Sequence, residues 1–301
     1  MSRFEAAKVR ESIGLIFAAG VPTQPPVRNE RILVLKAGGS ERNYWSDLVA
    51  YRELFLILAW RDLAVRYKQT TIGVAWAIIR PLITLIIFSV VFGRVAKLPS
   101  EGAAPYSLLV FAGMLPWTLF STILSDASSS LVTNANLISK VYFPRLIVPA
   151  ATIIVALVDF AVTFVLLLFM MAAFGVWPTW RIILLPLLVV LASGAAFGPA
   201  LLMAAMNVKY RDFRHIIPFA LQLGLYISPV GFSSSVVPSQ WRLLYSMNPA
   251  VGVIDGFRWC LLRDATIYLP GMWISISVAV LFVWLGVTYF RNAERDFADL
   301  V

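Results

Sequence analysis

Residues 61–82, RDLAVRYKQTTIGVAWAIIRPL, place basic side chains ahead of an apolar run and a further arginine inside that run. The inner arginine is Arg80, which stands immediately before Pro81. If the apolar run is a helix that begins near residue 72, Arg80 lies about 12 Å along its axis. A guanidinium at that depth has two uses. It either reaches back to a membrane interface or faces a protected cavity, where it binds a phosphate through paired hydrogen bonds.

The composition is that of a chain whose main solvent is lipid. The 301 residues are 60% hydrophobic and 14% charged, and the mean hydropathy is +0.81. A soluble domain of this length could not bury so much apolar surface. The net charge of +9 is compatible with nucleic acid, but nearly half of the lysines and arginines precede Thr71 and most others flank apolar segments. We therefore expect membrane lipids as partners and no nucleic acid.

Catalytic and metal-binding patterns are absent from the sequence. The single cysteine, Cys260, excludes an intrachain disulfide and a cysteine-based metal cluster, and the lone His215 lies among basic residues beside an apolar run. No carboxylate pair or metal cluster has the spacing that a membrane enzyme needs. There is no GxxxxGKS/T phosphate loop. We expect no enzyme, no catalytic residue, no metal and no bound cofactor in this chain, so any ATP hydrolysis belongs to a partner.

Two segments precede the long apolar part of the chain. Residues 1–46 are polar to mixed and are interpreted as a cytoplasmic N-terminal arm. Residues 47–69 have a helical pattern with charges too frequent for a membrane crossing, which predicts an amphipathic helix in the interface. Its apolar face carries Leu56, Trp60 and Leu63, and its polar face carries Asp62 and Arg66.

Residues 70–301 are predicted to form an all-α integral membrane domain. Six segments are close to the ~20 residues that a helical span requires: 72–92, 106–127, 149–174, 182–206, 216–236 and 270–290. The fifth contains Ser228, Pro229 and a serine triplet, which disfavours a straight helix facing lipid. Residues 237–262 are too apolar for a loop and too interrupted to span, which predicts short re-entrant helices on the periplasmic side.

The basic residues near the segment ends predict a cytoplasmic N-terminus, and an even number of spans then places both termini in the cytoplasm. The four that precede the first segment decide this orientation: Arg52, Arg61, Arg66 and Lys68. Within the spans, Asp159 should face protein or water rather than lipid, whereas Asp126 lies near a span end, where water can reach it.

The connection NANLISKVYFPR, residues 134–145, combines helix-capping amides with a rigid aromatic and basic end. It either docks into another protein or is an interfacial turn that holds lipid headgroups. A second connection, NVKYRDFRHIIP, is equally compatible with a positively charged anchor and with a contact to a partner or substrate.

From about Tyr51 to Arg291 the sequence resembles the membrane subunits of type-2 ABC exporters, specifically the polysaccharide and O-antigen exporter permeases. Several long stretches in the same order carry the resemblance. They are YRELFLILAWRDLAVRYKQTTIGVAWAIIRPL, FAGMLPWTLFS with NANLISKVYFPR, NVKYRDFRHIIPFALQLGLYISPV and NPAVGVIDGFR.

The resemblance implies a homodimer of six-span subunits in the bacterial inner membrane, joined by two copies of an ATPase subunit that binds ATP and Mg. It also implies export of a lipid-diphosphate-linked polysaccharide from cytoplasm to periplasm. It places the gate at Trp60, Arg61, Asp62, Arg66 and Lys68. It assigns coupling to the ATPase to Asn134, Asn136, Lys140, Tyr142, Phe143, Pro144 and Arg145.

Arg80 departs from the family, which more usually has an amide there, so its phosphate-binding role is a hypothesis from the residues alone. Alternative functions are a permease for capsular polysaccharide or teichoic acid, and an ion-coupled secondary transporter. The latter would need more coupling residues in the membrane than Asp159. A membrane glycosyl- or phosphotransferase would need an acidic or metal-binding cluster outside the spans.

Overall fold

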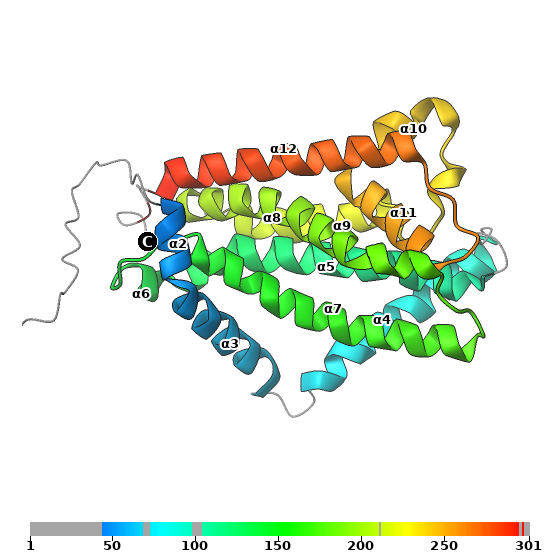
Figure 1. Cartoon of the computed structure of the whole chain (residues 1–301), viewed down its shortest axis with the longest axis horizontal. Coiled ribbons are helices and arrows are strands. Elements are labelled where there is room, and N and C mark those ends of the chain that lie inside the picture. The colour runs from blue at the N-terminus through cyan, green and yellow to red at the C-terminus, as the bar shows by residue number, and fades with distance from the viewer. Residues whose placement is uncertain (1–43, 69–72, 98–103, 211, 295–296, 298–301) are drawn as a thin grey trace, which may run out of the picture. The chain divides into compact units, whose positions relative to one another are not determined.

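The computed structural model describes residues 44–68, 73–97, 104–210, 212–294 and 297. The predicted N-terminal arm falls almost wholly outside the described residues, as do residues 69–72. Within the described ranges every regular element is a helix (Figure 1). The long helices are α3 (Arg52–Lys68), α4 (Gly73–Phe88), α5 (Tyr106–Thr133), α7 (Ile147–Ala173), α8 (Leu185–Lys209), α9 (Phe213–Ile227), α11 (Pro249–Leu261) and α12 (Leu269–Ala293). The short elements are α2 (Tyr44–Ala50), η1 (Ser89–Val95), α6 (Ala135–Ile138), η2 (Trp180–Leu184), η3 (Ser234–Val236) and α10 (Ser239–Tyr245).

Five helical stretches in the described part of the chain are long and apolar enough to cross a membrane. They are Ile78–Val95, Tyr106–Thr133, Ile147–Ala173, Trp180–Lys209 and Leu269–Ala293. The predicted fifth span, residues 216–236, instead contains α9, which has 15 residues and ends at Ile227. At 1.5 Å per residue α9 covers about 22 Å, less than the ~30 Å of a bilayer core. Pro229 and the serines that follow explain why the helix stops early.

Helix α5 is the centre of the bundle. In its most apolar stretch 67% of the residues are buried, against no more than 33% in the other four candidate spans. It packs against α7, α8 and α11, and its buried side chains include Leu108, Phe111 and Ile123. The neighbouring helices keep its serine hydroxyls away from lipid: Ser128 and Ser130 are buried, and each donates to a backbone carbonyl of the same helix.

Helices α8 and α12 make the closest helix contact in the bundle because small residues face each other. A Cβ added to Gly286 would lie 2.2 Å from the backbone oxygen of Gly198. Pairing of small residues lets membrane helices approach until their backbones touch. The α12 helix is thereby fixed along α8 as far as its C-terminal end.

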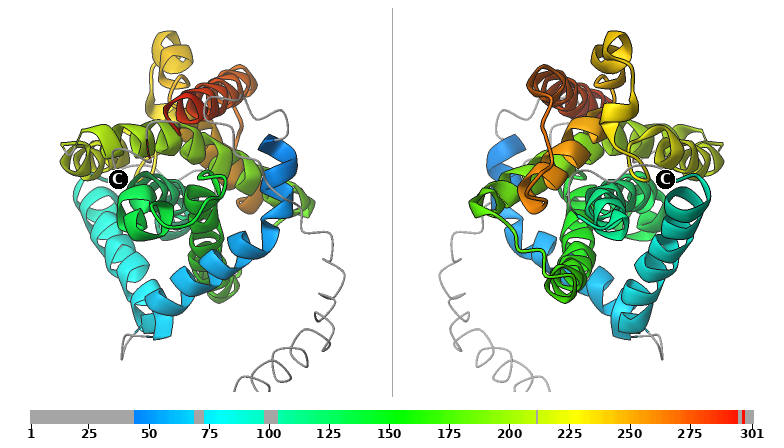
Figure 2. Two further views of the ribbon diagram at one scale, coloured as in Figure 1. Left: turned by 90° about the vertical axis from the view of Figure 1, so that its left-hand side faces the viewer. Right: turned by 90° about the vertical axis from the view of Figure 1, so that its right-hand side faces the viewer.

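Helices α2 and α3 occupy the range that the sequence predicts as one interfacial helix. Tyr51 joins them with helical hydrogen bonds, from its N–H to the Asp47 carbonyl and from the Phe55 N–H to its own carbonyl. We call residues 44–68 the α2–α3 arm. The arm shares an apolar cluster with α6, the start of α7 and the end of α12. In Figure 2 the C-terminal end of α3 lies close to the N-terminal end of α4.

Arg258 in α11 is a buried charge, although the sequence places it with the basic residues that flank the spans. It is 1% exposed. Its guanidinium donates to the carbonyls of Phe232 at 2.8 Å, Val230 at 2.9 Å and Leu109 at 3.2 Å. A cation removed from water needs such compensation. Arg258 therefore fixes the irregular chain after α9 against α5.

Replacing Arg258 with methionine should destabilise the folded chain by about 3 kcal/mol or more, because three buried carbonyls lose their donor. Thermal unfolding in detergent, followed by tryptophan fluorescence, measures the effect. Arg263→Met is the matched control, since Arg263 is exposed five residues further on. Equal unfolding temperatures for the two variants would contradict the assigned role.

Candidate functional site

A cavity of about 470 Å³ lies beside α5, lined by side chains of α3, α4, α5 and α7. The ends of the arm and of the first span contribute Arg66, Tyr67, Trp76 and Arg80, and the bundle contributes Trp117 and Asp159. Residues 61–82, with which the sequence analysis began, therefore supply one side of this cavity. The two arginines that the sequence singled out as separate features share it.

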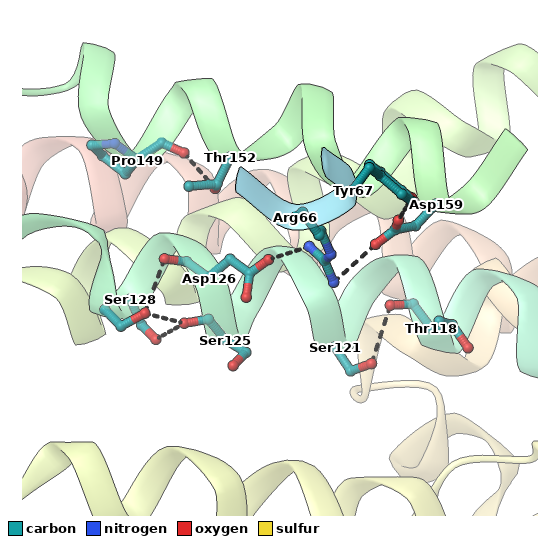
Figure 3. A network of polar contacts seen from close by, with 11 residues as sticks. Arg66, Tyr67, Thr118, Ser121, Ser125, Asp126, Ser128, Pro149, Thr152 and Asp159 are labelled. Atoms are coloured by element: carbon teal, nitrogen blue, oxygen red, sulfur yellow. Dashed lines mark hydrogen bonds and ion pairs between the residues drawn. The ribbon is translucent and has the colours of Figure 1, made fainter. Parts of the chain in front are cut away.

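Arg66 bridges two carboxylates on different helices (Figure 3). One guanidinium nitrogen lies 3.0 Å from an Asp126 oxygen on α5, and the other lies 2.9 Å from an Asp159 oxygen on α7. The Asp159 side chain is 15% exposed, whereas those of Arg66 and Asp126 are each 37% exposed. The planar fork of arginine suits this geometry, and a lysine would offer one point charge. The bridge holds the end of α3 to the bundle.

The neighbouring Tyr67 strengthens the same attachment. Its hydroxyl donates a hydrogen bond to the second oxygen of Asp159 (Figure 3). Burial, and then the hydrogen bond and negative charge of Asp159, raise the pKa of the Tyr67 phenol above its usual range. The phenol therefore stays protonated and remains a donor throughout the neutral pH range. Asp159 faces protein, as the sequence predicts for a carboxylate inside a span.

The Arg80 side chain lines the cavity and pairs with no carboxylate of the described residues. Its guanidinium lies 5.7 Å from the ring centre of Trp76, one helical turn earlier, and within the described ranges it makes no ion pair. Its backbone carbonyl accepts a hydrogen bond from the Thr84 hydroxyl at 3.0 Å. Pro81 provides no amide hydrogen to the surrounding turn. Arg80 is thus a cation of the cavity whose charge is not already neutralised.

The rest of the cavity wall combines hydroxyl groups with aromatic rings. Thr118, Ser121 and Thr122 line it from α5, and Thr163 lines it from α7. Trp117 lies nearby, stacked on Phe120 with ring centres 5.6 Å apart. Hydroxyls and flat rings are the groups that contact sugars through hydrogen bonds and stacking, and the wall is compatible with a polar organic ligand beside an anion.

The predicted gate residues lie on α3 in different surroundings. Trp60 is 72% exposed and Lys68 is also exposed. Arg61 pairs with Asp62 at 2.6 Å and donates to the Asn134 side-chain oxygen at 2.6 Å. The predicted apolar face is thus exposed at Leu56 and Trp60, whereas Leu58 and Ala59 of the same helix are buried against the bundle. Arg61 and Arg66 contact polar groups of α5 and its C-cap. The gate function stays a prediction.

The predicted coupling residues form a compact connection with a buried core. Asn134 caps α5, while Asn136 in α6 and Lys140 are exposed. Tyr142 is 50% exposed. Phe143 is only 4% exposed and Pro144 is buried with it, so both pack against their own chain. The Arg145 backbone N–H donates to Glu294 at 2.7 Å. Any partner that docks here meets Tyr142 and Lys140, not Phe143.

Sequence reasoning missed several groups that complete these sites. It left Asp126, Asp159 and Tyr67 outside the gate, although isolated charges in apolar segments signal a need for partners. It gave no role to Glu294, which holds the coupling connection. No spacing pattern links these residues, because they lie 60 to 250 positions from their partners along the chain.

Comparison with known proteins identifies the family. The model of the ABC-2 type transporter family matches residues 53–262, which include α4 to α11 and most of α3. The chain belongs to the ABC-2 type transporter family. It is similar to the O-antigen export system permease protein of Myxococcus xanthus, with 26% identity over 85% of this chain and 98% of that protein. Two O-antigen export system permease proteins of Klebsiella pneumoniae share 22% and 24% identity, each over 83% of this chain and 95% of its relative.

Membership of the ABC-2 family makes this chain a membrane-embedded transport component. The matched range contains the cavity and the 134–145 connection, and it starts within the α2–α3 arm. The site described above is therefore part of the transporter domain. Tyr44 and Glu294 lie outside the matched range.

The Arg66–Asp159 pair should contribute more to stability than an exposed pair on the same helix. We expect a double-mutant cycle of Arg66→Gln and Asp159→Asn to give a coupling of about 1–3 kcal/mol, because Asp159 is mostly desolvated. Thermal unfolding in lipid nanodiscs provides the four stabilities.

The matched cycle, Arg61→Gln with Asp62→Asn, should give less than about 0.5 kcal/mol because both side chains are more exposed. The same coupling in both cycles would mean that the Arg66 bridge does not fasten α3.

Proposed function

We propose that the chain is the membrane permease subunit of an ATP-driven exporter that carries lipid-diphosphate-linked, O-antigen-like polysaccharide from cytoplasm to periplasm. Two copies act with two copies of a separate ATPase subunit in the bacterial inner membrane, and both termini are cytoplasmic. Family membership and the names of the relatives support this assignment. Capsular polysaccharide and teichoic acid remain alternative cargoes of the same chemical kind.

The cavity beside Arg80 is the observation that carries the substrate proposal. A diphosphate that leaves water loses a large hydration energy unless a cation replaces it. Arg80 has no carboxylate partner among the described residues, while the charge of Arg66 is already matched by Asp126 and Asp159. The phosphates therefore bind at Arg80, and the sugars meet the hydroxyl and tryptophan wall. The exposed basic side chains of Arg61 and Lys68 concentrate the anion at the interface.

The six-span architecture is part of the same proposal. Helix α9 enters from the side on which α8 ends, and the irregular chain from Ser228 to Val237 completes the crossing. Its backbone is covered by protein, since Arg258 binds two of its carbonyls. Non-helical backbone at membrane depth requires such cover. The helices α10 and α11, which lie in the predicted range 237–262, are then the re-entrant elements on the periplasmic side.

An ion-coupled transporter is the weaker candidate. Such a protein needs a membrane carboxylate that is free to bind and release its ion. Asp159 is engaged by the Arg66 guanidinium and the Tyr67 hydroxyl. Dependence of export on the membrane potential or proton gradient, with no requirement for ATP, would favour this candidate over the ATP-driven exporter.

Arg80→Gln should keep assembly and basal ATP hydrolysis by the complex but lower the stimulation of hydrolysis by lipid-linked polysaccharide by about ten-fold or more, because one charge-assisted phosphate contact is lost. Arg80→Lys should restore it only in part, since a point charge lacks the fork. The measurement is ATP turnover of the purified complex in nanodiscs with and without the glycolipid.

Arg94→Gln is the matched control, because Arg94 is an exposed arginine at the other end of the same span. Equal stimulation of wild type, Arg80→Gln and Arg80→Lys would reduce Arg80 to an interface anchor. Arg80 would also be only an interface anchor if Arg80→Lys gave the same stimulation as wild type and Arg80→Gln only lowered stability.

Tyr142→Ala should weaken binding of the ATPase subunit, because Tyr142 is the exposed aromatic of the 134–145 connection and aromatic anchors dominate such contacts. We expect a loss of about ten-fold in affinity, measured by co-purification at decreasing concentration. Tyr210→Ala is the control, since Tyr210 has similar exposure in another connection. Equal losses for both variants would remove the special role of the 134–145 connection.

A further inference from the structure

Glu294 joins two segments that are far apart in the sequence. It directly follows α12, and one carboxylate oxygen accepts a hydrogen bond from the Arg145 backbone N–H at 2.7 Å. The other oxygen accepts one from the Tyr44 hydroxyl at 3.0 Å. The Arg145 guanidinium donates to the backbone carbonyl of Glu294. One residue therefore ties the end of the 134–145 connection to the start of the α2–α3 arm.

Glu294 is half-buried, and some of its neighbours are more deeply buried. Tyr44 is 5% exposed and Phe297 is 2% exposed, and the Arg145 guanidinium lies 5.8 Å from the Phe297 ring centre. The Arg291 guanidinium lies 4.7 Å from the Tyr44 ring centre. Hydrogen bonds to a charged group in such surroundings are stronger than in water. Burial, followed by the charge and hydrogen bond of Glu294, raises the pKa of Tyr44 above its usual range, so the phenol remains a donor.

A second contact ties the other end of the connection to the arm. The Arg61 guanidinium of α3 donates to the side-chain oxygen of Asn134 at 2.6 Å. Apolar packing adds to it, since Leu58 and Ala59 of α3 share a buried cluster with Ile138 of α6. The connection is therefore attached to the arm near its first and its last residue.

The arm links Tyr44 to the cavity without an intervening loop. Helical hydrogen bonds run through Tyr51 and join α2 to α3, and the two helices meet at an angle there (Figure 2). Tyr44 lies at one end, and Arg66 and Tyr67 lie at the cavity near the other end. A rigid element fixed at both ends transmits movement without a chain of intermediate side chains.

We infer that Glu294 is a positioning residue that transmits movement of the 134–145 connection to the α2–α3 arm, and so opens the cavity when the partner ATPase moves that connection. The inference rests on the proposed ATP-driven function. Its distinct content is the route, which runs from Arg145 through the Glu294 carboxylate to Tyr44. If Glu294 only fastened the end of α12, the arm would follow the connection through the Arg61–Asn134 contact, and the α3 response would not depend on Tyr44.

Tyr44→Phe tests the route by removing one hydroxyl while the ring remains packed. The probe is hydrogen–deuterium exchange of the complex with its co-purified ATPase in nanodiscs, without nucleotide and trapped with ATP and vanadate. In wild type we expect trapping to change exchange in both residues 134–145 and α3. In Tyr44→Phe the change at 134–145 should persist, and the change in α3 should fall about three- to ten-fold, the worth of one hydrogen bond.

Tyr51→Phe is the matched control, because it removes a hydroxyl from the same arm and no hydrogen bond of that hydroxyl is found in the described part of the chain. Glu294→Gln, compared with exposed Glu53→Gln, is the second variant and should lower the α3 response at least as much as Tyr44→Phe. An α3 response in Tyr44→Phe and Glu294→Gln equal to wild type overturns the route. Absence of any nucleotide response in wild type overturns the ATP-driven function itself.

Discussion

Arg66 determines how the α2–α3 arm meets the bundle, because its guanidinium is shared between carboxylates of α5 and α7. Two acids placed in apolar helices would each be costly alone. One arginine compensates both, and the Tyr67 hydroxyl completes the coordination of Asp159. The Arg66 bridge holds the end of α3 at the wall of the cavity beside α5, and α4 lines the same cavity.

The same constraint organises the region around Arg258. Carbonyls of α5 and of the irregular chain after α9 accept hydrogen bonds from its guanidinium. Gly113 leaves room for it, since a Cβ there would lie 2.7 Å from a guanidinium nitrogen. Arg66 thus holds the α2–α3 arm, and Arg258 holds a backbone that lacks regular structure.

Family membership and site chemistry answer different questions about this chain. At 22–26% identity, the relatives support the fold and the class of transport over most of the length. They do not decide what Arg80 binds or how the 134–145 connection acts. Those proposals depend on contacts: an arginine with no carboxylate partner among the described residues, a buried Phe143, and a glutamate shared between two segments.

The sequence by itself determined the membrane class and the positions of most helices, because hydropathy and helical periodicity are local properties. The predicted span 149–174 corresponds to Ile147–Ala173, and 270–290 corresponds to Leu269–Ala293. It also located the arm, the 134–145 connection and Arg80 as points of interest. The length of α9 was predicted less accurately. The position at which a helix stops beside a proline depends on which groups cover the broken backbone.

Only the tertiary structure decided which charges meet. Arg66 and Asp126 are 60 residues apart and Arg145 and Glu294 are 149 apart, and no periodic pattern encodes such pairs. The burial of Phe143 could not be predicted from the sequence either. An aromatic residue in a connection has the same sequence pattern whether it contacts a partner or packs against its own chain. Long-range packing sets these outcomes because the free energy of a charge or a ring depends on what surrounds it.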